Sequence, residues 1–459
     1  MDRALAHDVV VIGGGITGLA TAFYALKENP DASVLILEAG PRAGGKVASV
    51  RLCGREIDSG PDAFLARVEG GVDLAADLGL SDDLVAPATG RAWLWSGDLL
   101  HPLPGGLVLG VPSDPEALSG SSVLSADGLA RALAGRSGDA FALDDVSVAE
   151  GIGAHLGPEV VERLVDPLLG GINAGDCTSL SLRSASAELF AAVQEQDLMA
   201  ALRNHVVALR GQIGVSEERP VFLTPRGGVH QLVSALVAVL GARVRVNAAV
   251  SALDRIDHEW QVSVGSEVFR ARSVVMALPA VRTASLLHAV SPGLAMELSS
   301  IRTASVALTL FAYPRNAVSL PDGSGMLVAR CDGHLMTAAS WWSQKWPHLD
   351  TGDYAIIRVS AGRDGDERFM GMSDAELVDA LHEELVSVLD IRTRPTEVAV
   401  SRWIDGFPQY DVGHSALVRR IERHCDSLPG LLLAGASYRG VGLPACIRDA
   451  KAAALKAAT

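Results

Sequence analysis

The sequence predicts an α/β fold that includes a second, mixed-sheet region, and three observations support this. A β-branched run, a glycine loop and an apolar helix pattern follow one another at the start of the chain. Another buried-strand run, glycine loop and Ala-rich helix pattern close it, at residues 431–459. Between them, residues 299–400 hold alternating segments, such as 305–311 and 354–359, that are typical of strands in an antiparallel sheet.

The composition limits the class of protein. Of the 459 residues, 49% are hydrophobic and 20% are charged, which excludes a mostly disordered chain. The formal net charge of −15 would repel phosphates, so we expect neither nucleic acid nor an anionic membrane as a partner. The five cysteines form no C-x-x-C pair and the 12 histidines show no ligand spacing, so the sequence predicts no disulfide framework and no metal site.

One stretch has the length of a membrane helix. Residues 9–26 run for 18 positions without a charge. Three consecutive glycines, residues 13–15, would weaken a helix there, and the basic n-region of a signal peptide is missing. A strand, a turn and a helix explain the stretch better, so we expect a soluble, cytoplasmic protein.

The first forty residues carry the pattern of a dinucleotide-binding unit. A β-branched run at residues 9–12 predicts a buried strand. The loop of residues 13–18 reads G-x-G-x-x-G, and apolar residues at helical spacing follow it until Asn29-Pro30. A second strand over residues 34–37 ends at Glu38. Because strand, loop, helix, strand and acid all occur in register, an ordinary glycine turn explains the pattern less well.

Each part of this unit has a physical role. Gly13 permits the turn, Gly15 lets a pyrophosphate approach the backbone, and Gly18 lets helix pack on strand. The start of the helix offers free N–H groups and a positive dipole end to phosphates. Glu38 can accept hydrogen bonds from a ribose diol, while its charge would repel the extra phosphate of NADP.

A second glycine pair, flanked by cations, follows the acid. Arg42, Gly44, Gly45 and Lys46 offer further phosphate contacts from a loop. This resembles the R-x-G-G motif of two-dinucleotide-binding flavoproteins of the amine-oxidase and porphyrinogen-oxidase superfamily, which indicates FAD. The alternative is a glycine turn with solvated Arg and Lys.

The C-terminal residues supply a matching strand, loop and helix. A buried-strand run at residues 431–434 precedes Gly435, Gly440 and Gly442, and Pro444 suits the first position of a helix. A helix that starts there would direct its positive end at a flavin ring and stabilise negative charge on it. The alternative is a terminal strand and helix that only complete the core.

Four motifs carry a resemblance that extends from end to end. They are GPDAFL (60–65), TGRAWLWSGDLLHPLP (89–104), DPLLGGINAGD (166–176) and AGASYRGVGLP (434–444). Together they resemble the oxygen-dependent protoporphyrinogen and coproporphyrinogen oxidases, and most of all the soluble Gram-positive bacterial type that oxidises coproporphyrinogen III. The resemblance implies a two-dinucleotide-binding FAD domain, a mixed-sheet substrate domain and a helical domain.

The resemblance also implies which residues contact FAD, held without a covalent bond. They are Gly13, Gly14, Gly15, Ile16, Thr17, Gly18, Glu38, Ala39, Arg42, Gly45, Lys46, Gly60, Pro61, Asp62, Ala63, Val250, Trp403, Val441, Gly442 and Leu443. Ser437 occupies a place where many related flavoproteins carry an asparagine, and we expect this to alter one hydrogen bond without abolishing FAD binding.

The domains are expected to be discontinuous. The FAD domain takes residues 1–87, 217–298 and 401–459, the substrate domain takes 88–111 and 299–400, and the helical domain takes 112–216. Residues 97–98 predict a hairpin turn, residues 112–146 a loop-rich join, and residues 147–150 a capping box. Helices are expected from residue 158 and over 183–210. Charged residues interrupt the helical faces, which favours a solvated surface over a lipid contact.

The implied activity is the six-electron oxidation of coproporphyrinogen III to coproporphyrin III in haem biosynthesis, with three dioxygen consumed and three hydrogen peroxide released. Protoporphyrinogen IX is the alternative substrate. Because the flavin carries the electron chemistry, we expect no indispensable acid or base. The resemblance implies that Arg91 anchors a propionate and that the Gly175 carbonyl accepts a pyrrole N–H. A surface arginine and a simple turn glycine are the alternatives.

Two other functions stay open on this scaffold. A flavin amine oxidase would act on primary or secondary amines and show a C-terminal aromatic cage, and only Tyr438 lies near that place. A non-enzymatic escort protein for prenylated GTPases would not turn over a flavin, so a yellow protein argues against it. The sequence leaves open the oligomeric state and any transient contact with the next haem-pathway enzyme.

Overall fold

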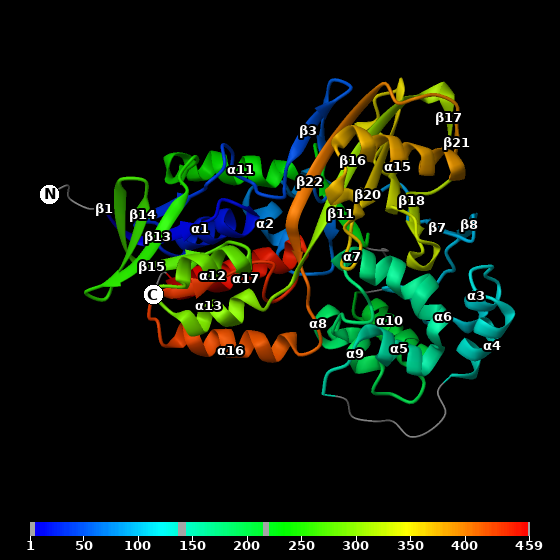
Figure 1. The fold of residues 1–459 in the computed structure, drawn as a ribbon, viewed down its shortest axis with the longest axis horizontal. Coiled ribbons are helices and arrows are strands. Elements are labelled where there is room, and N and C mark those ends of the chain that lie inside the picture. The colour runs from blue at the N-terminus through cyan, green and yellow to red at the C-terminus, as the bar shows by residue number, and fades with distance from the viewer. Residues whose placement is uncertain (1–4, 136–143, 214–219, 458–459) are drawn as a thin grey trace.

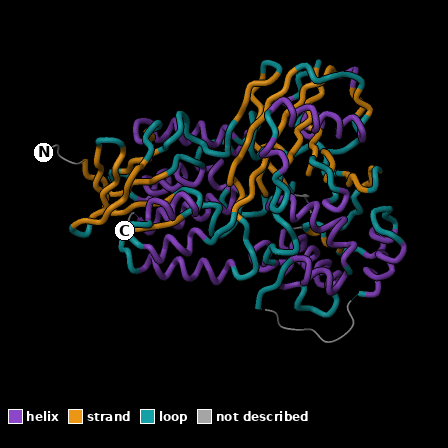
Figure 2. Tube along the Cα trace, viewed as in Figure 1, coloured by secondary structure: helices purple, strands orange, loops and turns teal. Residues whose placement is uncertain are grey.

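The computed structural model describes residues 5–135, 144–213 and 220–457. The two large sheets lie in separate regions, each with helices packed on it, and a third region consists mainly of helices (Figures 1 and 2). Residues 136–143, which belong to the predicted loop-rich join, lie outside the described residues. In the part of the chain that the structure describes, no helix combines the length and the apolar character that crossing a membrane requires.

The first sheet has seven strands, in the order β12-β2-β1-β15-β14-β13, and β23 also pairs with β15. The strands β12, β2, β1, β15 and β23 run parallel, whereas β14 and β13 are antiparallel additions. The bounds are β1 (Leu5–Ile12), β2 (Val34–Leu37), β12 (Val244–Arg245), β13 (Val250–Ile256), β14 (Glu259–Val264), β15 (Glu267–Met276) and β23 (Leu431–Leu433). The first and last predicted strands are therefore confirmed, and both belong to one sheet.

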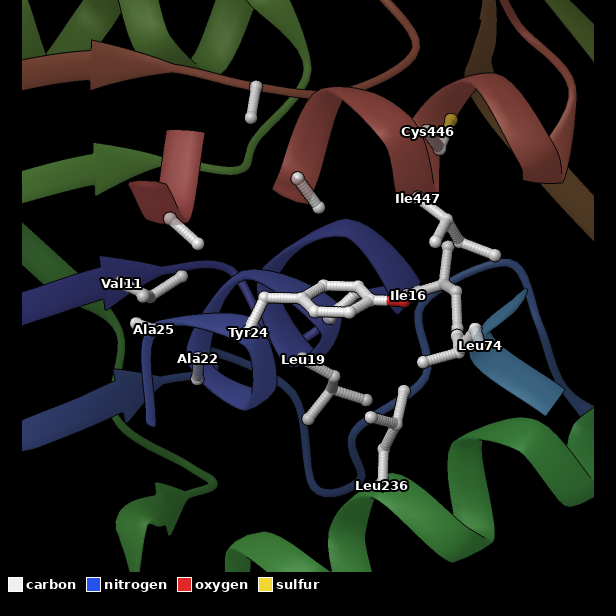
Figure 3. Packing of buried hydrophobic residues seen from close by; sticks show 14 of the residues in the cluster. Val11, Ile16, Leu19, Ala22, Tyr24, Ala25, Leu74, Leu236, Cys446 and Ile447 are labelled. Carbon is white, nitrogen blue, oxygen red and sulfur yellow. The ribbon is translucent and has the colours of Figure 1, made fainter. Parts of the chain in front are cut away.

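Helices cover both faces of this sheet (Figure 1). On one face pack α1 (Ile16–Glu28), α11 (His230–Leu240) and α17 (Leu443–Ala457), and on the other α12 (Ala280–Leu287), α13 (Pro292–Ser299) and α16 (His414–Asp426). Figure 3 shows residues of α1, such as Ile16 and Tyr24, in one cluster with Cys446 and Ile447 of α17. The two ends of the chain thus share a core.

The second sheet also has seven strands, in the order β22-β16-β20-β19-β18-β7-β8. Its strands are β7 (Trp93–Ser96), β8 (Leu99–Pro102), β16 (Thr303–Pro314), β18 (Gly325–Val328), β19 (Met336–Trp341), β20 (Tyr354–Ala361) and β22 (Glu397–Pro408). The predicted hairpin is confirmed as β7–β8, with Gly97 and Asp98 both at positive φ. Helix α15 (Asp374–Val388) packs on one face. The strand β22 crosses the predicted domain limit at residue 400.

The helical region holds α3 (Pro115–Ser119), α4 (Ala126–Ala134), α5 (Val148–Leu156), α6 (Pro158–Val160), α7 (Gly171–Asn173), α8 (Leu182–Ala185), α9 (Ala187–Ala192) and α10 (Leu198–Ile213). The predicted capping box is confirmed, because the Ser147 hydroxyl accepts from the Glu150 N–H and the Glu150 carboxylate accepts from the Ser147 N–H. The predicted helix over 183–210 is instead three helices, since the Ser186 side chain caps a new one at α9.

Two further differences from the sequence expectation have local causes. The join of residues 112–146 holds α3 and α4, because Asp114 and Ser125 cap their first turns. After α6 the chain continues as a π-helix, η2 (Val161–Gly170), with Pro167 inside it. Proline lacks the N–H that an α-helical turn needs, and π-type turns occur where the regular ladder is interrupted.

Short elements complete the fold. They are β3 (Ser49–Leu52), β4 (Arg55–Asp58), β5 (Phe64–Leu65), β6 (Leu84–Val85), β9 (Leu107–Val108), β10 (Val111–Pro112), β11 (Phe222–Pro225), β17 (Val318–Ser319), β21 (Asp390–Ile391), α2 (Gly71–Asp77) and α14 (Trp342–Lys345).

Candidate functional site

The first glycine loop lies between the end of β1 and the start of α1, beside the acid that ends β2. The N–H of Gly14 donates to Oε2 of Glu38 at 2.7 Å, and the N–H of Gly40 donates to Oε1 at 2.7 Å. These two bonds fix the carboxylate, and each oxygen keeps a lone pair for a further donor such as a hydroxyl.

The glycines of this loop meet different surroundings. A Cβ at Gly18 would lie 1.9 Å from the carbonyl O of Gly13, so only glycine lets the helix approach the loop. A Cβ at Gly15, by contrast, would have no heavy atom within 4 Å. Helix α1 begins at Ile16 with no side-chain cap and no acidic residue in its first turn. The open space over Gly15 and the uncapped N–H groups fit an anionic group.

The second glycine pair lies against the first loop. The N–H of Gly44 donates to the carbonyl O of Gly14 at 2.7 Å. Gly45 approaches so closely that its Cβ would be 3.2 Å from the Cα of Gly15. The exposed Arg42 donates to the carbonyl O of Gly45 at 3.3 Å. The two loops therefore form one surface with a cation at its rim.

Residues 59–63 bring Lys46 and β22 to the same place. A Cβ at Gly60 would lie 1.9 Å from the carbonyl O of Lys46. The indole Nε1 of Trp403 donates to the carbonyl O of Ser59 at 3.1 Å. Burial lowers the pKa of Lys46, and the charge of Cys446, at the start of α17, opposes this. Predicted cofactor residues from two distant parts of the chain thus meet.

The side chain of Asp62 is engaged with the second sheet region. Its carboxylate accepts from Lys345 at 2.9 Å and from the indole of Trp346 at 3.2 Å, and it lies 3.6 Å from the Arg358 guanidinium. Burial raises the pKa of Asp62, but Arg358 and Lys345 outweigh it and hold that pKa well below its usual range. Any contact between Asp62 and a cofactor stays a prediction.

Two residues that the sequence reasoning missed hold the C-terminal loop. The Asp449 carboxylate accepts from the N–H of Gly435 at 2.8 Å. The Tyr410 hydroxyl donates to the carbonyl O of Ala436 and accepts from the N–H of Gly440 at 2.7 Å. For Tyr410 the only sequence signal was its position just after a long strand.

The same loop contacts the first glycine loop. A Cβ at Gly435 would lie 3.5 Å from Oγ1 of Thr17. Residues 441–443 lead into α17, whose first turn carries no acidic residue. The Tyr438 side chain instead lies in the core on the α12 and α16 face of the sheet, and the Ser437 hydroxyl accepts from the N–H of Ala280 at 3.1 Å.

Val250 is the first residue of β13, and the residues just before it hydrogen-bond to the backbone of Glu38 and Gly40. The N–H of Ala248 donates to the carbonyl O of Glu38 at 2.8 Å, and the N–H of Asn247 donates to that of Gly40 at 2.8 Å. The segment before Val250 is thus bonded to the backbone of Glu38 and Gly40, and contact between Val250 and a cofactor stays a prediction.

The predicted substrate residue Gly175 lies just after α7. Its carbonyl O accepts from Arg330. The Gln409 side chain donates to the carbonyl O of Asn173 at 3.2 Å, and the next residue, Tyr410, holds the C-terminal loop. Residues 409–410 therefore connect the turn at Gly175 to the C-terminal glycine loop.

Arg91 stands apart from this assembly. Its side chain is 73% exposed and pairs with Asp322, which is 66% exposed. Its carbonyl O accepts from the N–H of Ser324 at 2.8 Å, just before β7 and β18 of the second sheet. The structure places Arg91 beside the second sheet and not among the glycine loops.

Together these elements define the fold of a dinucleotide-binding protein in which glycine loops from both ends of the chain lie together. The family of flavin-containing amine oxidoreductases matches residues 16–457. The chain is 33% identical over 466 residues to a coproporphyrinogen III oxidase of Bacillus subtilis (strain 168), with 98% of both chains covered. It is 27% identical to protoporphyrinogen oxidase 1, chloroplastic, of Arabidopsis thaliana, with 98% of this chain and 88% of the relative covered.

A solved structure gives the same likeness in three dimensions. A crystal structure from Exiguobacterium sp. 255-15, assigned as a protoporphyrinogen oxidase, superimposes with a TM-score of 0.87 at 31% identity and 99% coverage of both chains. The chain therefore belongs to the coproporphyrinogen III and protoporphyrinogen oxidases within the flavin-containing amine oxidoreductase family.

Proposed function

We propose that this protein binds FAD without a covalent bond and oxidises coproporphyrinogen III to coproporphyrin III in haem biosynthesis. The conversion removes six electrons, so each porphyrin consumes three dioxygen and releases three hydrogen peroxide. The observation that carries the proposal is the 33% identity to a coproporphyrinogen III oxidase along 98% of both chains.

The chemistry of the loops fits FAD. Glu38 offers carboxylate lone pairs for a ribose, and the open space over Gly15 adjoins uncapped N–H groups for a pyrophosphate. A covalent bond to the flavin would need a reactive side chain such as a cysteine, and Cys446, at the start of α17, lies beside these loops. Burial raises the pKa of Cys446 to about 11, so the thiol stays protonated and unreactive, which supports non-covalent binding.

A bound flavin would supply the two-electron chemistry and pass electrons to dioxygen. The residues of the chain orient it and supply the surrounding charge. The first turn of α17 carries no carboxylate, so its positive dipole end favours negative charge placed there. Lys46, whose Cε lies 3.3 Å from a Cβ built at Gly406, adds a cation from the side of β22.

We propose that Arg91 and Gly175 contact the porphyrinogen. Arg91 would exchange its exposed partner Asp322 for a propionate. The Gly175 carbonyl accepts one hydrogen bond from Arg330, and its second lone pair can accept a pyrrole N–H. The other proposed features are the three discontinuous domains, a cytoplasmic location, and dioxygen and the next haem-pathway enzyme as partners.

Protoporphyrinogen IX is the second candidate substrate, which the likeness to the Arabidopsis protoporphyrinogen oxidase favours. The test is a side-by-side fluorescence assay of both porphyrinogens, under air and under nitrogen. We expect rapid formation of coproporphyrin III in air and none above background under nitrogen. Faster formation of protoporphyrin IX would reverse the assignment, and oxidation of amines alone would replace it.

A further inference from the structure

A cavity lined by charged groups lies beside the turn at Gly175, between the helical region and the second sheet. Its volume is about 20 Å³, and its lining comes from η2, α7 and the turn after it, β19, and the ends of β18 and β20. Polar lining residues include Asp166, Arg330, Thr337 and Arg363. Small-molecule pockets span roughly 300–1,000 Å³, so this cavity is far too small for a whole tetrapyrrole and has room only for the end of one arm of a ligand.

Arg363 is the unusual member of this lining. It is only 7% exposed, and no hydrogen bond or ion pair joins its guanidinium to any other described residue. Its Nε is buried without a partner. Burial lowers the pKa of Arg363, the charge of Arg330 adds to this, and the charges of Asp166 and Asp366 oppose it. A buried guanidinium that makes no hydrogen bond costs stability, so its presence points to a hydrogen-bond partner that arrives with a ligand.

The carboxylates around Arg363 already have partners. Asp166 accepts from Nε of Arg330 at 3.1 Å. Asp176 lies 3.5 Å from Arg330, and two further carboxylates pair with other arginines at 2.8 Å, Asp364 with Arg302 and Asp366 with Arg368. The backbone also fixes Arg363, because Gly362 before it has φ +92 and a Cβ there would lie 2.4 Å from the Phe369 ring.

Hydrogen bonds connect the wall of the cavity to the C-terminal glycine loop. The N–H of Asp364 donates to the carbonyl O of Ala174 at 2.7 Å, so the chain carrying Arg363 is bonded to the turn at Gly175. Gln409 binds the same turn and Tyr410 binds the C-terminal loop. The wall of the cavity is therefore bonded, through the turn at Gly175, to the C-terminal loop that we assign to the flavin.

We propose that Arg363, with Arg330 behind it, binds one carboxylate arm of the substrate. The inference rests on the proposed function, because it takes the substrate to be a porphyrinogen that carries propionates. A planar guanidinium binds a carboxylate through two parallel hydrogen bonds. The carboxylate of the ligand would therefore accept the hydrogen bonds that no protein group accepts from Arg363. Arg363 would then be a second anion site, separate from Arg91.

The test uses the FAD-loaded full chain and two stable probes, coproporphyrin III and its tetramethyl ester, followed by porphyrin fluorescence. Arg363→Gln should weaken binding of the tetracarboxylate about tenfold or more, and should leave binding of the ester unchanged. Arg363→Lys keeps the charge and should show a smaller loss. The matched control is Arg394→Gln, an exposed arginine that pairs with Asp379 and does not line the cavity, which should bind both probes as the wild type does.

Thermal unfolding of the ligand-free variants separates a binding role from a structural one. Because Arg363 has no partner, Arg363→Gln should melt at the same temperature as the wild type or higher. Equal weakening of both probes together with a lower melting temperature would overturn the proposal, as would unchanged affinity for the tetracarboxylate. A wild type that oxidises neither porphyrinogen would instead refute the proposed function.

Discussion

Replacing Gly15 by alanine separates cofactor binding from folding. In the ligand-free protein a Cβ at Gly15 has no heavy atom within 4 Å, and the backbone lies at φ −70 and ψ 176, which alanine adopts readily. Fewer unfolded conformations should stabilise the variant by about 0.4–1 kcal/mol. Loss of glycine at the N-cap should destabilise it by about 1 kcal/mol. The two effects offset each other, so unfolding should change by no more than about 1 kcal/mol.

The effect on FAD should be much larger. The methyl group would occupy the open space over Gly15 and displace a pyrophosphate from the N–H groups at the start of α1. Each hydrogen bond to a charged group contributes about 1.5–3 kcal/mol, which corresponds to roughly a tenfold to 150-fold change in affinity. Loss of one or two such bonds should therefore raise the Kd for FAD by at least about tenfold.

The assay is a titration of the apoprotein with FAD, followed by flavin fluorescence, beside a thermal melt without FAD. Gly371→Ala is the matched control, because a Cβ there also meets nothing within 4 Å and the position lies in the second sheet region. Gly18→Ala should fail to fold properly, since its Cβ would lie 1.9 Å from a carbonyl O. Wild-type FAD affinity in Gly15→Ala would show that the pyrophosphate does not lie over Gly15.

The remaining predictions concern the C-terminal loop, one ion pair and the substrate. Tyr410→Phe removes a hydroxyl that accepts from the N–H of Gly440, and should reduce stability by about 1–3 kcal/mol and weaken FAD binding; an unchanged melt and Kd would contradict this. The hydrogen bond to Asp58 raises the pKa of His230, so this pair stabilises the fold below about pH 6.5 and loses its contribution as pH rises through the folded pKa. The stability difference between wild type and His230→Gln, measured by urea unfolding, should therefore shrink between about pH 6 and pH 9, and a difference that grows would refute it. Arg91→Ala should leave the melt unchanged, because exposed pairs contribute little, and raise KM for the porphyrinogen about tenfold with a smaller effect on kcat; an unchanged KM would remove Arg91 from the site.

Much of the first sheet could be predicted because its signals are local. The run at residues 9–12, the glycines that follow and Glu38 lie within one short segment, and β1, α1 and β2 form there as expected. The C-terminal strand and helix could be predicted equally well from residues 431–444. Backbone conformation and helix capping act between near neighbours, so a linear pattern records them.

The contacts that complete the site join residues far apart in the chain, and no local pattern records these. Trp403 bonds Ser59 across 344 positions, and Arg330 bonds Gly175 across 155. The role of Arg363 was not predicted because it depends on the surroundings of the side chain, which is buried and makes no hydrogen bond. Its sequence signal is slight, an arginine that follows a glycine at the end of an alternating strand.

The most direct test of the whole account is the visible absorption band of the flavin in the purified protein, recorded without oxygen. Addition of coproporphyrinogen III should bleach the band, and admitting air should restore it while coproporphyrin III and hydrogen peroxide accumulate. A protein that carries no flavin band, or whose band is bleached by an amine and not by either porphyrinogen, would contradict the account.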